Sequence, residues 1–303
     1  MPRIEEFLTF CKIVDLKSFS LAAEVLHISQ SAVSQQMKSL EEAYGTRLLH
    51  RNGLKVVPTE QGKIVYDYGS RMLTLYEHSH QQVEAQNGTV TGHLQIGSSS
   101  GPGETLIPII LGGFKTLFPD VQVALRVGDS REITDAVFNR LLEIAFVGLF
   151  RRDRHLIFEP FLHDEIILVA PADHPWASRS SINYQEFLKA PLILQQQGSG
   201  ATALLREVLA ENGIGLNRLN VVMQLGLQES TKVAVRNGYG MTMISHLGVQ
   251  AELARGELVH IEVENLKLVR DIYTCYNRDE ALTPLAQNFL DYAIQNRHPK
   301  TKE

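Results

Sequence analysis

Polar side chains suited to reading DNA gather on one face of the segment 29–42. The set recurs at helical spacing and comprises Gln30, Ser31, Ser34, Gln35 and Lys38. Amides and hydroxyls of this size reach base edges in a major groove, and a lysine suits a phosphate. We interpret this face as a candidate DNA-reading surface. The plainer alternative is a small helical hairpin with a polar outer face.

A second polar set lies at Gly97-Ser98-Ser99-Ser100-Gly101, between a predicted strand and a predicted helix. The pattern fits G-x-S-x-G, the nucleophile elbow of hydrolases, which also needs an acid and a histidine downstream. His246 follows a predicted strand but has no convincing acid partner. The simpler interpretation is a cradle of hydroxyls and N–H groups for a small anion. Ser98, Ser99 and Ser100 are therefore candidate ligand residues, and we expect no catalytic residue.

Three further turns are candidates for the same site. Gln195, Gly198 and Ser199 lie in a glycine-containing turn before a helix expected to begin near Thr202, although such turns are also ordinary connections. The weaker candidates are Val147-Gly148 and Gly226-Leu227-Gln228. No arginine falls inside these turns, so we expect hydroxyls, amides and N–H groups to hold a small carboxylate, phosphate or sulfate. The basic run at 151–154 predicts solvated surface, with Arg151 near the mouth of the site as the alternative.

The DNA-reading face needs a scaffold, which the surrounding residues predict. Two short helices flank a turn at His27–Ser29, and Ser29 is a suitable N-cap for the second helix. Apolar residues of that helix recur at helical spacing and predict its buried face: Ala32, Val33, Met37 and Leu40. This is the pattern of a helix-turn-helix, with residues 3–15 as a supporting helix. Extended segments on both sides of Asn52-Gly53 predict a wing, with Arg51 and Lys55 at its tip.

A long helix over residues 59–86, capped by Thr59, follows the wing. Its apolar stripe consists of Ile64, Tyr68, Met72, Leu75, Tyr76 and Val83. We favour a dimer linker over a helix packed on its own wing, because two-fold protein symmetry matches two DNA half-sites. Residues 87–92 then predict a hinge. Beyond 93, strand-like and helical segments alternate, which indicates α/β lobes with largely parallel sheets.

The composition of the 303 residues, 44% hydrophobic and 21% charged, is that of an ordinary soluble protein. The net charge of -5 argues against DNA binding only weakly, because residues 29–58 hold four lysines and arginines against two glutamates. Cys11 and Cys275 predict neither a disulfide framework nor a metal site. The first ten residues lack the apolar core of a signal peptide, and no membrane span is visible. We therefore expect a cytoplasmic protein with no membrane partner.

Residues 1–62 resemble the winged helix-turn-helix of LysR-type transcriptional regulators. The matching residues are Phe19, Ala22, Ala23, Leu26, Ser29–Ser34, Leu40, Glu41, Gly45, Leu48, Arg51, Pro58, Thr59 and Gly62. Two positions depart from the family pattern, since Ser31 stands where proline is usual and Leu49 where phenylalanine is usual. Ser31 puts in doubt one contact at the start of the recognition helix. The remainder fits the same family more weakly.

The resemblance implies an α+β architecture with a winged helix-turn-helix at 1–58, a linker helix and hinge at 59–88, and an effector-binding domain at 89–303. That domain would resemble periplasmic binding proteins, with lobe I at about 90–163 and 268–300 and lobe II at about 164–267. The family places the serine turn, the Gln195 turn, Val147-Gly148 and Gly226 at the effector cleft. Glu143 stands at the acidic position that the family has before the predicted strand at 144–148, where aspartate is more usual.

The implied function is a transcriptional regulator and not an enzyme, with no cofactor beyond a small, anionic metabolite as effector. Its partners would be double-stranded promoter DNA and itself, as a homodimer or a dimer of dimers (a homotetramer). Closure of the cleft on the effector would change how the DNA-binding pairs are placed. Two rival classes stay open on the residues alone: a small-molecule binding protein or hydrolase with an incidental hairpin, and a coiled-coil adaptor. The α/β remainder disfavours the adaptor.

Overall fold

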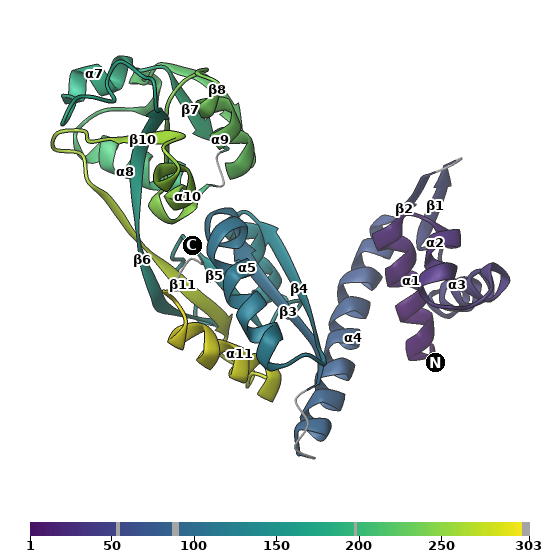
Figure 1. Ribbon diagram of the computed structural model, residues 1–303. Helices are drawn as coiled ribbons and strands as arrows, with labels where there is room; N and C mark the ends of the chain where they lie inside the picture. The colour runs from purple at the N-terminus through teal and green to yellow at the C-terminus, as the bar shows by residue number, and fades with distance from the viewer. Residues whose placement is uncertain (53–54, 87–90, 197–198, 299–303) are drawn as a thin grey trace. The chain divides into compact units, whose positions relative to one another are not determined.

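The computed structural model describes residues 1–52, 55–86, 91–196 and 199–298 (Figure 1). The chain forms two compact units, Met1–Gln86 and Asn87–Glu303. The elements of the first unit are α1 (Ile4–Leu16), α2 (Phe19–Val25), α3 (Gln30–Tyr44), β1 (Leu49–Asn52), β2 (Lys55–Pro58) and α4 (Glu60–Gln86). No helix in the described ranges is both long and apolar enough to cross a membrane.

The first unit contains the predicted helix-turn-helix. Ser29 caps α3 by accepting a hydrogen bond from the Ala32 N–H at 3.1 Å. His27 adopts a left-handed backbone conformation (φ 54°) that turns the chain between α2 and α3. Val33, Met37 and Leu40 are buried with side chains of α1 and α2, among them Phe10. The polar face of α3 is therefore the face that does not pack on the core.

The wing is a two-stranded antiparallel ribbon in which Asn52 pairs with Lys55. Its connection, including Gly53 of the predicted turn, lies outside the described residues. Glu41 of α3 fixes the ribbon by accepting hydrogen bonds from the N–H groups of Leu48 (2.8 Å) and Leu49 (3.3 Å). The side chain of Thr59 caps α4 as predicted, accepting a hydrogen bond from the Gly62 N–H at 2.9 Å.

Helix α4 has two apolar faces. Val65, Gly69 and Leu73 face α1, where Gly69 approaches Phe7 and Cys11. The predicted stripe lies on another face and is exposed, with Ile64 at 60% and Val83 at 62% exposure. Within the described residues, this exposure does not support the alternative in which the stripe packs on the wing of the same chain. The stripe is available to another chain.

The second unit holds two lobes joined by two long strands. Its strands are β3 (Gly92–Ser99), β4 (Val121–Gly128), β5 (Ile144–Val147), β6 (Leu156–Pro171), β7 (Leu192–Gln195), β8 (Val221–Leu225), β9 (Thr242–Ser245), β10 (Leu258–Ile261) and β11 (Leu268–Asn277). Its helices are α5 (Ser100–Leu117), α6 (Ser130–Phe138), α7 (Tyr184–Lys189), α8 (Gly200–Glu211), α9 (Gln228–Arg236), α10 (Gln250–Ala254) and α11 (Pro284–Gln295), with single 3₁₀ turns at Leu216–Arg218 and His246–Gly248.

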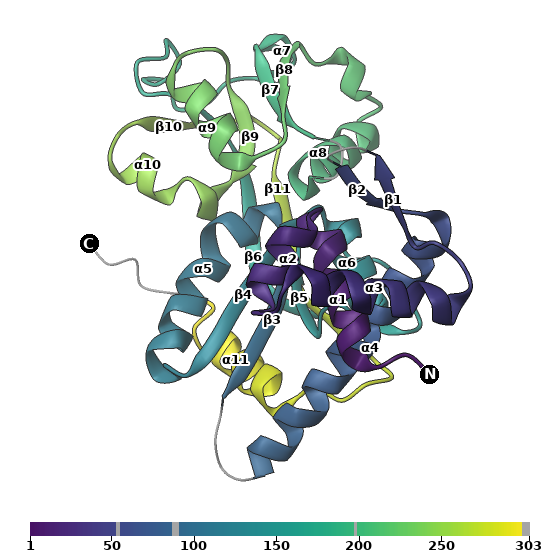
Figure 2. The ribbon, with the colours of Figure 1, turned by 90° about the vertical axis from the view of Figure 1, so that its right-hand side faces the viewer.

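The main sheet has the order β10-β6-β11-β5-β3-β4, with β9 also pairing with β6 (Figure 1). Strand β3 is parallel to β4 and β5, but β6 is antiparallel to β9, β10 and β11. The expectation of largely parallel sheets was wrong, because β6 and β11 run in opposite directions between the lobes. In the second lobe, β7 and β8 pair in parallel as a separate ribbon (Figure 2).

Each lobe has its own hydrophobic core. Phe114, Phe146 and Phe289 are central to the first, and Phe187, Leu192 and Leu205 to the second. Strand β6 contributes Phe161 to the first core and Leu168 to the second, so it belongs to both lobes. Of this strand, the sequence pattern predicts only residues 166–170 as extended. The assignment of lobe boundaries at 163/164 and 267/268 stays a prediction.

Candidate functional site

The polar face of α3 is accessible. Gln30, Ser31, Gln35 and Lys38 are exposed, and Ser34 is half-buried. The Ser31 hydroxyl lies 2.9 Å from that of Ser29. Ser31, which stands where proline is usual in the family, therefore extends the helix cap. Lys38 forms only an exposed pair with Glu42 at 3.5 Å, which leaves its charge available.

Arg51 and Lys55 lie on opposite strands of the wing: Lys55 pairs with Asn52 in the last pair of the ribbon, and Arg51 pairs with Val56 in the pair before it. Their side chains are outside the described part of the structure. The ribbon therefore carries one cation on each strand beside its turn. A wing with this charge can approach DNA phosphates, which position a protein without reading sequence.

A second site lies in the second unit, where both lobes line one cavity of about 20 Å³. The lining residues are Ser99, Ser100, Gly101, Asp129, Gln195, Ser199, Gly200, Ala201, Gln228, Ser245 and Arg270. A volume of this size holds about one water molecule. In this arrangement the lobes therefore lie close together at the site.

Arg270 of β11 is the one fully charged donor on the cavity wall. Antiparallel pairing sets it directly opposite Asp164 of β6. Its Nε and Nη2 donate to Asp164 Oδ2 at 3.0 and 2.8 Å, and Ser245 donates to Oδ1 at 2.7 Å. The Asp164 side chain is fully buried and that of Arg270 is 10% exposed. Nη1 takes no part in this pair.

Three glycines make room for the guanidinium. A Cβ at Gly200 would lie 2.5 Å from Arg270 Nη1, one at Gly148 2.9 Å from the same atom, and one at Gly101 3.2 Å from Nη2. Gly101 and Gly148 belong to the first lobe and Gly200 to the second. The two lobes thus meet around one arginine, and a side chain at Gly200 would displace it.

Two helices begin at the cavity with their first N–H groups uncapped by a side chain. Ser99 is the N-cap of α5 and Ser199 that of α8, and neither hydroxyl accepts from its own helix. Ser99 Oγ accepts from the Gly148 N–H at 3.1 Å, and Ser199 Oγ donates to Gln195 Oε1 at 2.5 Å. Uncapped helix N-termini carry partial positive charge and bind anions. The cavity therefore has the character of an anion site.

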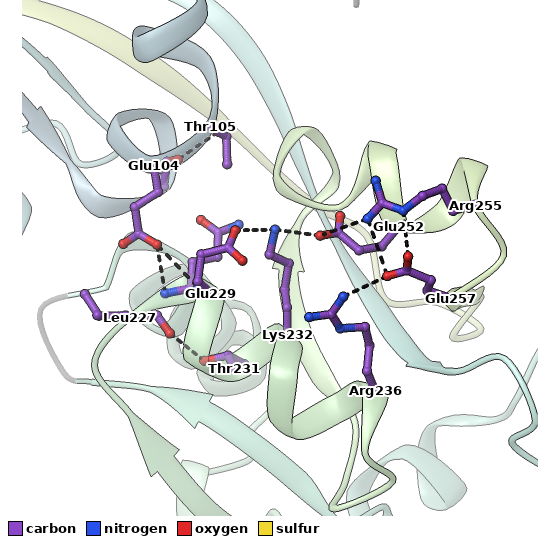
Figure 3. Close-up of polar contacts among 12 residues, drawn as sticks. Glu104, Thr105, Leu227, Glu229, Thr231, Lys232, Arg236, Glu252, Arg255 and Glu257 are labelled. Atoms are coloured by element: carbon purple, nitrogen blue, oxygen red, sulfur yellow. Dashed lines mark hydrogen bonds and ion pairs between the residues drawn. The ribbon is translucent and has the colours of Figure 1, made fainter. Parts of the chain in front are cut away.

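The first lobe also caps α9 of the second lobe (Figure 3). Glu104 of α5 accepts from the backbone N–H groups of Gln228 at 3.1 Å and Glu229 at 3.4 Å. Burial raises the pKa of Glu104, and these two N–H donors offset only part of that effect. This carboxylate ties the lobes together beside the cavity.

A buried lysine holds α9 from the other side. Lys232 forms ion pairs with Glu229 and with Glu252 of α10, the latter at 2.8 Å. Burial alone would lower the pKa of Lys232, but the hydrogen bonds to both glutamates raise it. The start of α9, which carries Gln228 to the cavity, is therefore fixed by charges on both sides.

The structure brings together four of the nine predicted effector residues at the cavity: Ser99, Ser100, Gln195 and Ser199. Gly148 lies just behind Arg270, and Gly198 is outside the described residues. Ser98 does not reach the cavity, because it is fully buried and donates to the carbonyls of Ser99 and Phe146. Val147 is likewise buried in β5. Gly226 approaches Gln196 instead, while its neighbour Gln228 lines the cavity.

The expected ligand set, with hydroxyls, amides and N–H groups only, needs correction because Arg270 is present. The arginine lies on a strand and not in a turn. Its signal in the sequence is the period of two, which puts Arg270 in phase with the buried Leu268 and Ile272. Asp164 is similarly in phase with the buried Leu162 and Ile166. Opposite charges in the buried phase of two strands predict a paired, enclosed site.

Arg151 does not line the cavity. It pairs with Asp135 at 2.6 Å and Asp153 at 3.4 Å, and the hydrogen bond to Asp135 raises its pKa. The hydrolase alternative also lacks support, since no histidine is among the lining residues, all of which are described. A serine nucleophile needs a base within hydrogen-bond reach. Within the described ranges, no group of three or more potential ligands could hold a metal ion.

Comparisons with known proteins cover both units. Residues 4–63 match the family described as bacterial regulatory helix-turn-helix protein, lysR family, and residues 87–297 match the LysR substrate binding domain. The HTH-type transcriptional activator CmpR of Synechocystis sp. is 29% identical over 289 residues, which cover 95% of this chain and 94% of CmpR. The HTH-type transcriptional regulator CysL of Bacillus subtilis is 30% identical over 264 residues, 87% of each chain.

Two solved structures share the fold. Full-length CbnR complexed with its target DNA matches with a TM-score of 0.73 at 16% identity, covering 97% of this chain and 99% of that one. The regulatory domain of CcmR from Synechocystis PCC6803, in complex with 2-PG, matches with a TM-score of 0.62 at 24% identity, covering 68% and 98%. The chain therefore belongs to the LysR family of helix-turn-helix transcriptional regulators.

Proposed function

We propose that this regulator reads promoter DNA with α3 and the wing, and that its response is set by a small anion bound in the cavity between the lobes. The observation that carries the proposal is the convergence of two uncapped helix N-termini, one from each lobe, on Arg270, whose side chain is 10% exposed. The 2-PG bound to the CcmR regulatory domain supports an anionic effector.

The control mechanism follows from the size of the cavity. At about 20 Å³ it excludes a metabolite in this conformation, so the effector binds a more open arrangement of the lobes. A ligand shifts the equilibrium between arrangements by its difference in affinity for them. The two lobes contact each other at Glu104 and around Arg270, and these contacts would differ between the two arrangements. The anion therefore acts on the joint between the lobes.

The DNA-bound form would be a homodimer built on α4, with a dimer of dimers as the larger assembly. The support is the exposed stripe on α4, whose six side chains are 43–62% exposed. Burial of such a stripe against its copy is the usual source of stability in paired helices. Two copies of α3 would then meet two half-sites in the promoter.

Effector binding is tested by calorimetry on the full chain with sulfate, phosphate and 2-PG as probes. We expect at least one to bind, and Arg270→Met to abolish that binding. Arg236→Met is the control, since Arg236 forms an exposed ion pair with Glu257 away from the cavity.

Ser99→Ala tests the hydrolase alternative, because a hydrolase would lose turnover. A regulator would retain DNA binding with an altered response to the anion. Absence of binding by all three probes would refute the anionic effector.

DNA binding is tested by gel shift with the promoter next to the gene for this protein. Alanine at Gln30, Ser34 or Gln35 should reduce discrimination between sequences, because these side chains reach base edges. Changes at Lys38, Arg51 or Lys55 should weaken binding to all sequences and reduce its salt dependence. No retardation at low salt, with or without the anions, would contradict the proposal. Equal losses from both sets would contradict the division of roles.

A further inference from the structure

One buried amide side chain lies at the cavity. Gln228, at the start of α9, is only 2% exposed and lines the cavity. Neither its Nε2 nor its Oε1 has a hydrogen-bond partner among the described residues. A buried amide without partners is destabilising, so an unpaired one at a ligand cavity points to a partner carried by the ligand.

The fold holds this amide in place from two sides. Glu104 fixes the Gln228 backbone by accepting from its N–H at 3.1 Å. Gly248 leaves the space that the amide occupies, since a Cβ there would lie 1.8 Å from Gln228 Nε2. In this arrangement of the lobes the side chain is therefore positioned without a ligand, as expected for a residue that selects ligands.

The acceptors of the cavity define what the ligand must donate. Arg270 and the N-termini of α5 and α8 supply only donors, which suit the oxygens of an anion. Gln228 Oε1 is an unpaired acceptor, and the carboxylate of Asp129 is a second acceptor on the wall. A fully ionised carboxylate or sulfate has no hydrogen to donate to either. An ammonium would donate, but the two helix N-termini and Arg270 disfavour a cation.

We infer that the effector is an organic anion that also carries a hydroxyl group, and that Gln228 is the residue that selects it. This inference rests on the proposed anion site and deepens it. The charged end of the ligand lies against Arg270 and the helix N-termini. Its hydroxyl donates a hydrogen bond to Gln228 Oε1 and accepts one from Gln228 Nε2, so both polar atoms of the amide become paired.

The test is calorimetric titration of the full chain with matched acids that differ by one hydroxyl: glycolate and acetate, lactate and propionate, malate and succinate. We expect the hydroxylated member of at least one pair to bind about 10- to 100-fold more tightly, since its absence leaves a buried polar group unpaired. Equal affinities within every pair would overturn the inference and leave the anion site intact. Binding of sulfate or phosphate without any hydroxy acid would also overturn it.

Two variants identify the residue responsible. Gln228→Met keeps the length of the side chain and removes both polar atoms, so the hydroxyl preference should disappear while binding of the plain acid persists. Gly248→Ala displaces the amide without changing Gln228 and should have the same effect. Retention of the preference in both folded variants, judged by their thermal unfolding, would refute the role of Gln228. If no anion binds the wild-type chain at all, the proposed function fails together with the inference.

Discussion

The ion pair between Arg270 and Asp164 offers the sharpest test of how the lobes are joined. Arg270→Met retains an apolar stem of similar length but removes two charge-assisted hydrogen bonds, at 3.0 and 2.8 Å. Asp164, 2% exposed, would then keep only Ser245 as a donor. Removal of one member of a buried pair costs about 3–5 kcal/mol, because the remaining charge stays buried without compensation. We expect a loss of that size in the free energy of unfolding.

The size of the coupling follows from a double-mutant cycle. Asp164→Asn keeps an acceptor for Ser245 but leaves the guanidinium without its counterion. In the double variant Arg270→Met/Asp164→Asn, neither charge is left unpaired. The double variant should therefore be more stable than the sum of the single losses predicts, by about 2 kcal/mol, within the range of contacting pairs. Coupling energy of this size would show that the pair acts as one unit.

The assay uses the single tryptophan of the chain. Trp176 packs on the core of the second lobe, so its fluorescence in urea reports the unfolding of that lobe and not of the DNA-binding unit. Arg236→Met is the control, since its pair with Glu257 has the same 2.8 Å length but side chains 36% and 34% exposed. Exposed pairs contribute about 0.2–1 kcal/mol. A loss for Arg270→Met no larger than that of the control, or strict additivity in the cycle, would refute the reasoning.

Three more predictions concern other parts of the chain. Ile64→Glu should shift the protein toward monomer in analytical ultracentrifugation with little effect on its fold, because Ile64 is 60% exposed; Lys63→Glu, at an exposed position outside the stripe, should not. Gly62→Ala should destabilise the DNA-binding unit by about 1–3 kcal/mol and weaken gel shifts, since its Cβ would lie 2.0 Å from the Leu48 carbonyl oxygen; Gly112→Ala, in open space, should leave both unchanged. Because burial raises the pKa of Glu104, the stabilisation that its protonation gives is present at low pH and lost as pH rises through the raised pKa. Urea unfolding at pH 4 and pH 8 should show wild type losing stability relative to Glu104→Gln as pH rises, and parallel behaviour would contradict this.

The helix-turn-helix could be predicted in detail because its determinants are local. The Ser29 cap, the buried positions Val33, Met37 and Leu40, and the Thr59 cap each act within a few residues of the helix they define. The exposed stripe on α4 could be predicted as well, since its helical period is visible without a partner. By contrast, only residues 166–170 of β6 were predicted as a strand. Its first half is irregular in burial, with Glu159 and Pro160 exposed beside buried Phe161, so no simple alternation marks it.

The effector-type site was predicted only in part because it depends on register between distant strands. The serine turn and the Gln195 turn are local, and four of their residues reach the cavity. Arg270 is 106 residues from Asp164, and the residues near either one do not predict the antiparallel pairing that sets them opposite each other. Gln228 is similar: its burial depends on Glu104 in the other lobe and on a glycine 20 residues away. A charged or amide side chain in the buried phase of its own element is the signal that survives in the sequence. At Asp164, Arg270 and Gln228 that signal marks residues at or beside the cavity where the two lobes meet.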